Sequence, residues 1–184
     1  MWIIGKKIEK ALRAFQKILG ISKNKCEKTS RNSLQEKLVK SREKEQRDFK
    51  NYLYSFLNNP YRWGGDDPIN GFDCSGAVQE WLAYFGEDPK GDQTAHALWN
   101  YFKFIGRSTK DKRALGGLAF YGSEKKIIHV AMLIDEKRVI EYGGGGPRTT
   151  STENAASQNA FCRIRPIEYR PDFFGVYHPH FLLW

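Results

Sequence analysis

One segment, residues 59–86, constrains the fold of this chain more than any other. It begins with turn-forming glycines, prolines and asparagines, and then runs through Asp73-Cys74-Ser75-Gly76 directly into an apolar pattern with helical spacing that ends near Gly86. Cys74 is therefore predicted at the first turn of a helix, where unpaired backbone N–H groups and the helix dipole favour an anion. A cysteine in this position carries more of the nucleophilic thiolate at neutral pH.

The order of the remaining periodicities predicts the fold class. Helical spacing also occurs at residues 34–58 and 94–104, whereas the alternation typical of strands begins at Leu118, after a polar loop over residues 107–117. Strands are expected at residues 118–121, 126–134, 138–142, 160–167 and 173–177. The short connection Asp135-Glu136-Lys137 joins two of them into an antiparallel hairpin. Helices followed by strands predict an α+β fold, with helices packed on a mostly antiparallel sheet of about five strands.

The N-terminal part differs in charge from the rest, so we predict a basic arm over residues 1–48 and a folded domain over residues 49–184. Residues 1–50 contain 15 basic and 6 acidic residues and carry the whole net charge of +9. Residues 1–22 have the pattern of a basic amphipathic helix, and residues 22–33 are predicted to be a polar linker. The helix could dock on a protein partner, lie on an anionic membrane surface or pack on its own domain. Lysines interleaved with glutamates disfavour nucleic-acid binding.

Composition and spacing also disfavour several classes of protein. The chain has no apolar run of about 18 residues, so no membrane-spanning helix is expected. Its first residues do not form a standard signal peptide, because charges interrupt the apolar stretch early. The three cysteines, Cys26, Cys74 and Cys162, are widely spaced and form no CxxC pair or Cys/His cluster. Free thiols are expected rather than disulfides, and no metal or cofactor is predicted.

A cysteine nucleophile needs a base within hydrogen-bond reach, and the base needs an orienting group. Among the four histidines, His129 stands out because it interrupts an alternating apolar strand. If the hairpin pairs residues whose numbers sum to about 271, Val130 faces Glu141, and His129 is offset from Glu141 by one position. We predict that Cys74, His129 and Glu141 form a catalytic set. The simpler alternatives are a structural histidine and an exposed glutamate beside a flexible loop at residues 143–146.

Two motifs in this chain resemble a known catalytic signature. Tyr61-Arg62-Trp63-Gly64-Gly65 and Gly71-Phe72-Asp73-Cys74-Ser75-Gly76 are similar to the signature of NlpC-type cysteine peptidases, which are papain-like enzymes that cut peptide or amide bonds in bacterial peptidoglycan. The family's histidine-bearing strand resembles residues 129–134, and the segment before it resembles Leu118-Ala119-Phe120. The resemblance extends over about residues 49–177 and gives residues 1–48 no counterpart.

The resemblance implies a papain-like fold and a role for individual residues. Cys74 would be the nucleophile, His129 the general base and Glu141 the third residue, which orients the histidine. Tyr61 matches the family's tyrosine, whose hydroxyl points at the reacting thiol, and it would support the oxyanion together with Ser75.

Substrate contacts are implied for Trp63 and Asp73. The sequence departs from the family pattern at two positions. Glu141 stands where the family more often has His, Asn or Gln, and a carboxylate there would favour imidazolium more strongly. Gly116-Gly117-Leu118 stands where the family has Gly-Asp-Leu.

The function implied by the resemblance is hydrolysis of a peptidoglycan stem peptide through a thioester acyl-enzyme, without metal or cofactor. One alternative is a structural or docking component, associated with a virion or a secretion system, in which the N-terminal arm is the functional part. Acyl transfer is disfavoured because Cys74 precedes His129 in the chain. Residues 141–146 and 163–170 resemble a bacteriophage-encoded branch of the family. The location of the protein is left open, since a phage particle, a lysis system or a secretion system could each deliver it to the cell wall.

Overall fold

The computed structural model describes residues 23–104 and 108–182, with side chains from residue 33 onward. The amphipathic helix expected at residues 1–22 lies outside the described residues. The chain divides into two compact units, residues 1–47 and residues 48–184.

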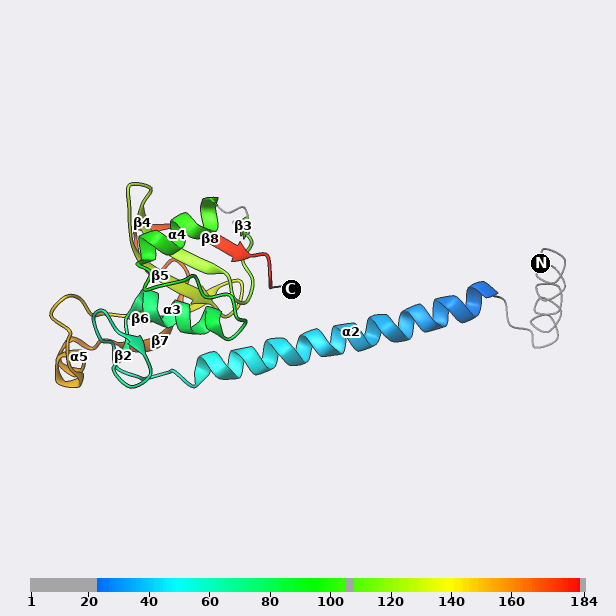
Figure 1. Ribbon diagram of the computed structural model, residues 1–184, viewed down its shortest axis with the longest axis horizontal. Coiled ribbons are helices and arrows are strands. Elements are labelled where there is room, and N and C mark those ends of the chain that lie inside the picture. Colours follow the sequence, from blue (N-terminus) through cyan, green and yellow to red (C-terminus); the bar gives the residue numbers. More distant parts are fainter. Residues whose placement is uncertain (1–22, 105–107, 183–184) are drawn as a thin grey trace. The chain divides into compact units, whose positions relative to one another are not determined.

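The described part of the first unit is helical. Helix α2 (Lys23–Tyr54) is one unbroken helix, so the prediction of a linker at residues 22–33 is wrong (Figure 1). The segment contains no proline or glycine, and its lysines, glutamates, glutamines and arginines are good helix formers. A polar composition argues against a buried face, but not against a helix. Within the described residues, no helix combines the length and the apolar character needed to cross a bilayer.

An antiparallel sheet forms the centre of the second unit. Its six strands lie in the order β3-β8-β4-β5-β6-β7, and every neighbouring pair is antiparallel (Figure 1). The strands are β3 (Ser108–Lys110), β4 (Leu118–Ser123), β5 (Lys126–Leu133), β6 (Arg138–Gly143), β7 (Phe161–Pro166) and β8 (Phe173–Pro179). The predicted α+β class is therefore confirmed. The sheet has one strand more than expected, because β3 lies in the presumed polar loop and pairs with β8.

Three further helices, a small hairpin and the last residues of α2, 48–54, complete the described part of the second unit. Helix α3 (Cys74–Ala83) begins at the predicted cysteine, and α4 (Ala95–Phe104) follows it, as the apolar spacing predicted. Helix α5 (Thr152–Gln158) was not predicted, although Ser151 caps it by accepting a hydrogen bond from Asn154 N–H. Strands β1 (Asp66–Asp67) and β2 (Gly71–Phe72) pair just before α3.

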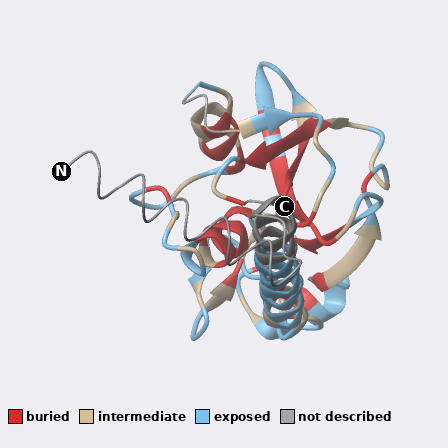
Figure 2. Ribbon diagram, turned by 90° about the vertical axis from the view of Figure 1, so that its right-hand side faces the viewer, coloured by how far each residue is buried: buried red, intermediate tan, exposed pale blue. Residues whose placement is uncertain are grey.

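Strands β4, β5, β6 and β8 of the sheet are mostly buried, whereas the edge strands β3 and β7 are more exposed (Figure 2). Alternate residues such as Phe120, Val130 and Met132 share a core with α3 and α4. The residues between them form a second cluster, which the connection from β7 to β8 covers. That cluster consists of Ala119, Tyr121, Ala131, Leu133, Val139, Ile167 and Val176, with Tyr169 and Phe173 packed against it. His129 is paired with Tyr121 in the sheet and contacts its ring, so the histidine lies beside this second cluster.

Candidate active site

Asp73 fixes the start of the helix that carries Cys74. Its backbone is extended, and its Oδ1 accepts hydrogen bonds from the Ser75 and Gly76 N–H groups, both at 2.9 Å. The Ser75 hydroxyl donates to the same oxygen at 3.0 Å, and Gly64 N–H donates to Oδ2 at 3.2 Å. The hydrogen bonds that Asp73 accepts from the start of α3 do not include the Cys74 N–H. The cap therefore uses the Ser75 amide and leaves the Cys74 amide available to a ligand.

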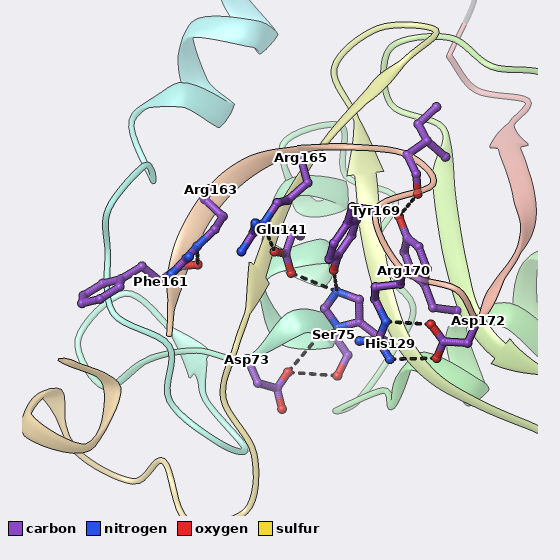
Figure 3. A network of polar contacts seen from close by, with 12 residues as sticks. Asp73, Ser75, His129, Glu141, Phe161, Arg163, Arg165, Tyr169, Arg170 and Asp172 are labelled. Atoms are coloured by element: carbon purple, nitrogen blue, oxygen red, sulfur yellow. Dashed lines mark hydrogen bonds and ion pairs between the residues drawn. The ribbon is translucent and has the colours of Figure 1, made fainter. Parts of the chain in front are cut away.

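His129 lies between the thiol and a buried carboxylate. Its side chain is 7% exposed, and its Nε2 lies 3.0 Å from Glu141 Oε2 in an ion pair. The Tyr169 hydroxyl lies 3.3 Å from the same nitrogen (Figure 3). Since Nε2 faces these two groups, Nδ1 is the ring nitrogen left for the hydrogen bond with the Cys74 side chain.

The charges around His129 favour its protonated form. Burial acts to lower the pKa of the imidazole, but the charge and hydrogen bond of Cys74 and then those of Glu141 outweigh burial. The net effect raises the pKa of His129 well above its ordinary value. The site is therefore suited to an imidazolium beside a thiolate.

The contact between His129 and Glu141 was predicted, but with the wrong register. Strands β5 and β6 pair Met132 with Ile140 and Leu133 with Val139, so the paired numbers sum to 272 (132 + 140) and not to about 271. Extended along the ladder, the observed register makes His129 and Glu141 diagonal neighbours on one face of the sheet. The predicted register would have placed them on opposite faces.

The glycine run after Glu141 gives space to two side chains of the site. A Cβ at Gly143 would lie 2.0 Å from Glu141 Oε2, and one at Gly145 would lie 2.3 Å from the Tyr61 ring. Residues 143–146 were considered a flexible loop. The structure shows instead that positions 143 and 145 need glycine, because neighbouring side chains occupy the space that a Cβ would take. Repeated glycines were visible in the sequence, but their partners were not.

Tyr61 and Trp63 reach the site from the loop before α3. The Tyr61 N–H donates to Ala160 O at 3.0 Å, and its ring is buried. Burial raises the pKa of Tyr61, as do the charges of Cys74 and Asp73, so its hydroxyl stays protonated and can donate. Trp63 is 50% exposed.

A cavity of about 550 Å³ opens over these groups. All of the predicted site residues except Glu141 line it, namely Tyr61, Trp63, Asp73, Cys74, Ser75 and His129. Glu141 lies behind the histidine and is 2% exposed.

Sequence reasoning gave no site role to Tyr169 or Arg165. Tyr169 lies in a connection without periodicity and Arg165 lies on β7, and both fall in residues 163–170, which were distinguished only by their resemblance to other sequences. In the described part of the chain, no group of three or more His, Cys, Asp or Glu side chains could hold a metal ion. The two cysteines whose side chains the structure describes, Cys74 and Cys162, are free.

A cysteine at the start of a helix, followed in the chain by an antiparallel sheet that carries the histidine, defines the papain-like α+β class. Comparison with known proteins specifies this class further. The chain belongs to the NlpC/P60 family, whose model matches residues 58–166.

Individual relatives agree with this assignment. The chain is 32% identical over 95 residues to the bifunctional muramidase/DL-endopeptidase CwlT of Bacillus subtilis (strain 168), and the match covers 50% of this chain but only 27% of that protein. Two solved structures share the fold. The NlpC/p60 domain of the peptidoglycan hydrolase SagA is 21% identical, with a TM-score of 0.50, and the match covers 71% of this chain and 96% of that one. The P60 domain of the M. avium subspecies paratuberculosis antigen MAP1204 is also 21% identical, with a TM-score of 0.51 and coverage of 74% and 97%. The predicted family is confirmed, whereas the bacteriophage branch stays a prediction.

Proposed function

We propose that this chain is a cysteine peptidase that hydrolyses a peptide or amide bond in the stem peptides of peptidoglycan. The observation that carries the proposal is the position of His129, which lines the same cavity as Cys74 and is ion-paired at 3.0 Å with the buried Glu141. Membership of the NlpC/P60 family supports the same reading. So do the relatives, one named a DL-endopeptidase and another a peptidoglycan hydrolase.

The first half of the reaction would be acylation of Cys74. The thiolate attacks the scissile carbonyl carbon, and the carbonyl oxygen becomes an oxyanion. The Cys74 N–H and the Tyr61 hydroxyl are the donors proposed to stabilise that oxyanion, because both residues line the cavity. The C–N bond then breaks, the imidazolium of His129 gives its proton to the departing amine, and a thioester remains on Cys74.

The second half would be hydrolysis of the thioester. His129 is now neutral and accepts a proton from a water molecule, whose oxygen attacks the thioester carbonyl. The C–S bond breaks, the acid product leaves, and the thiolate–imidazolium pair is restored. Glu141 keeps the imidazole oriented through both halves.

The bond that is cut and the residues that bind the stem peptide form the finer part of the proposal. The link between D-glutamate and the diamino acid is the substrate that the family resemblance suggests. Trp63 presents a half-exposed ring to the cavity and is proposed to contact the peptide. Asp73 lines the cavity as well, but its Oδ1 already caps α3 and its Oδ2 already accepts a hydrogen bond from the Gly64 N–H.

Digestion of purified sacculi tests the proposal. Soluble fragments released by the wild type and by Cys74→Ser are separated and identified by mass spectrometry, with Cys162→Ala as a control that removes a buried cysteine away from the cavity. We expect new peptide termini with the wild type and with Cys162→Ala, and none with Cys74→Ser. Identical fragment profiles for the wild type and Cys74→Ser would refute the assignment of Cys74.

A truncation separates the enzyme from the alternative docking role. A chain that begins at Asp48 retains the whole second unit. Under the proposal it still cleaves isolated sacculi. If cleavage requires residues 1–47, the arm is part of the catalytic machinery and the proposed domain division is wrong.

A further inference from the structure

Arg165 contacts both of the groups that face Nε2 of His129. Its Nε lies 3.7 Å from Oε1 of Glu141, while the other carboxylate oxygen, Oε2, lies 3.0 Å from His129 (Figure 3). Its guanidinium also lies over the Tyr169 ring, 5.5 Å from the centroid, and the Tyr169 hydroxyl lies 3.3 Å from His129 Nε2. Arg165 thus touches the histidine only through its neighbours.

We propose that Arg165 is a positioning residue, which holds the Glu141 carboxylate in place and offsets its charge so that His129 can both keep and release a proton. The idea rests on the proposed function, because only a turnover with an acid step and a base step needs both states of the imidazole. Arg165 is not itself a catalytic residue, since it touches neither Cys74 nor the cavity.

The physical reason lies in the burial of Glu141. The Glu141 side chain is 2% exposed, and burying an ionised carboxylate without a compensating charge costs free energy. Without such compensation, its negative charge would also strongly favour the protonated form of His129. Deacylation needs the neutral imidazole as base. Arg165 is suited to supply the compensation because its side chain is 40% exposed, which keeps the outer part of the guanidinium hydrated, while its Nε is buried beside Glu141.

Other ionisable groups around this pair do not supply the same compensation. Cys74 faces the histidine from α3, and Tyr121 from β4. Arg170 lies near the rings of Tyr121 and Tyr169, but its guanidinium is paired with Asp172 through two hydrogen bonds of 2.8 Å, so the two charges largely cancel.

The neighbouring strand position offers a matched control. Arg163 lies two residues before Arg165 on β7 and is paired with Glu141 in the sheet register. Its guanidinium instead binds Asn159, through the backbone oxygen and through Oδ1 at 3.3 Å. Removing the charge of Arg163 therefore changes the charge of the strand without changing the partner of the Glu141 carboxylate.

The test is an NMR titration of the His129 ring, assigned with His129→Gln among the four histidines. Removing Arg165 leaves the carboxylate uncompensated, so Arg165→Met should raise the titration midpoint by on the order of half a pH unit, and Arg165→Lys by less. Arg163→Met should leave the midpoint within measurement error of the wild type. Glu141→Gln should lower the midpoint. In the Glu141→Gln background, Arg165→Met should shift the midpoint by less than half of the shift that it causes when Glu141 is present.

Two results would overturn the proposal. One is an Arg165→Met midpoint equal to that of Arg163→Met. The other is an Arg165 effect that keeps half or more of its size when Glu141 is Gln. The same spectra show whether each variant is folded. The titration needs no substrate, so it decides the role of Arg165 even if the sacculus digestion fails. If the sacculi are cleaved, the alkaline limb of kcat/KM should move with the midpoint.

Discussion

Replacing Gly143 by alanine is expected to damage catalysis by displacing a different residue. Gly143 lies in β6, two positions after Glu141 and on the same face, and its φ is not in the left-handed region, so alanine fits the backbone. The added Cβ would lie 2.0 Å from Glu141 Oε2 and 2.7 Å from Cδ. The substitution therefore perturbs the carboxylate and not the strand.

The size of the effect follows from these distances. An ordinary carbon–oxygen contact begins at about 3.4 Å, so the carboxylate must retreat by about 1.4 Å from its position 2.0 Å from the new carbon. A movement of that size lengthens the 3.0 Å contact with His129 to about 4 Å. If weakening this ion pair costs about 1.5–3 kcal/mol, the range for interactions with a charged group, kcat/KM should decrease by about 10- to 160-fold.

The assay is release of new peptide termini from sacculi, measured together with the urea midpoint of unfolding. Gly175→Ala is the matched control, because Gly175 lies in β8 of the same sheet and a Cβ there would have no described heavy atom within 4 Å. We expect Gly175→Ala to retain activity. In a Glu141→Ala background, Gly143→Ala should cost little more, since the carboxylate is already gone. A folded Gly143→Ala protein with wild-type kcat/KM would refute the reasoning.

Three further predictions concern single residues. Tyr61→Phe should lower kcat by about 10- to 100-fold with little change in KM, because the hydroxyl is proposed to act on the oxyanion; a change confined to KM would contradict this. Asp73→Ala should lower the free energy of unfolding by about 1 kcal/mol in urea denaturation, whereas Asp73→Asn should retain most of it, because asparagine also caps helices. The pKa of His129 is raised on folding, so its contribution to stability is full below about pH 6.5 and is lost as pH rises through the folded value. The stability difference between the wild type and His129→Gln should accordingly shrink at alkaline pH, and a difference that grows there would contradict the sign.

The sequence predicted those parts of the molecule that depend on local chemistry. The apolar spacing after Cys74 predicted the helix that the structure shows as α3, whereas the N-cap role of Asp73 was not predicted. The hairpin between β5 and β6 was also local, because a short turn joins two alternating strands. The predicted register of this hairpin differs from the observed one by one in the sum of the paired residue numbers. The pairing depends on turn geometry, which residue types do not determine.

What the sequence could not reveal are contacts between segments far apart in the chain. Tyr169 reaches His129 from a connection 40 residues away, without any periodic pattern to mark it. Gly145 is needed because the Tyr61 ring occupies the space where its Cβ would be. The helix at residues 23–33 differs from these cases. Its segment is polar and has no apolar face, which favours the prediction of a linker. Each of its residue types is nevertheless tolerated in a helix.

The buried carboxylate of Glu141, the proposed third residue of the site, is accommodated by several elements at once. Glu141 needs a glycine at position 143 to leave space for its oxygens, and the arginine on β7 to lie beside its charge. The tyrosine from the β7–β8 connection adds a second contact to the same ring nitrogen. An amide at position 141 would need neither the offsetting charge nor as much solvation, because it is neutral. It follows that introducing a carboxylate alone into a relative with an amide there should weaken catalysis, whereas adding the glycine and the arginine with it should restore part of the activity.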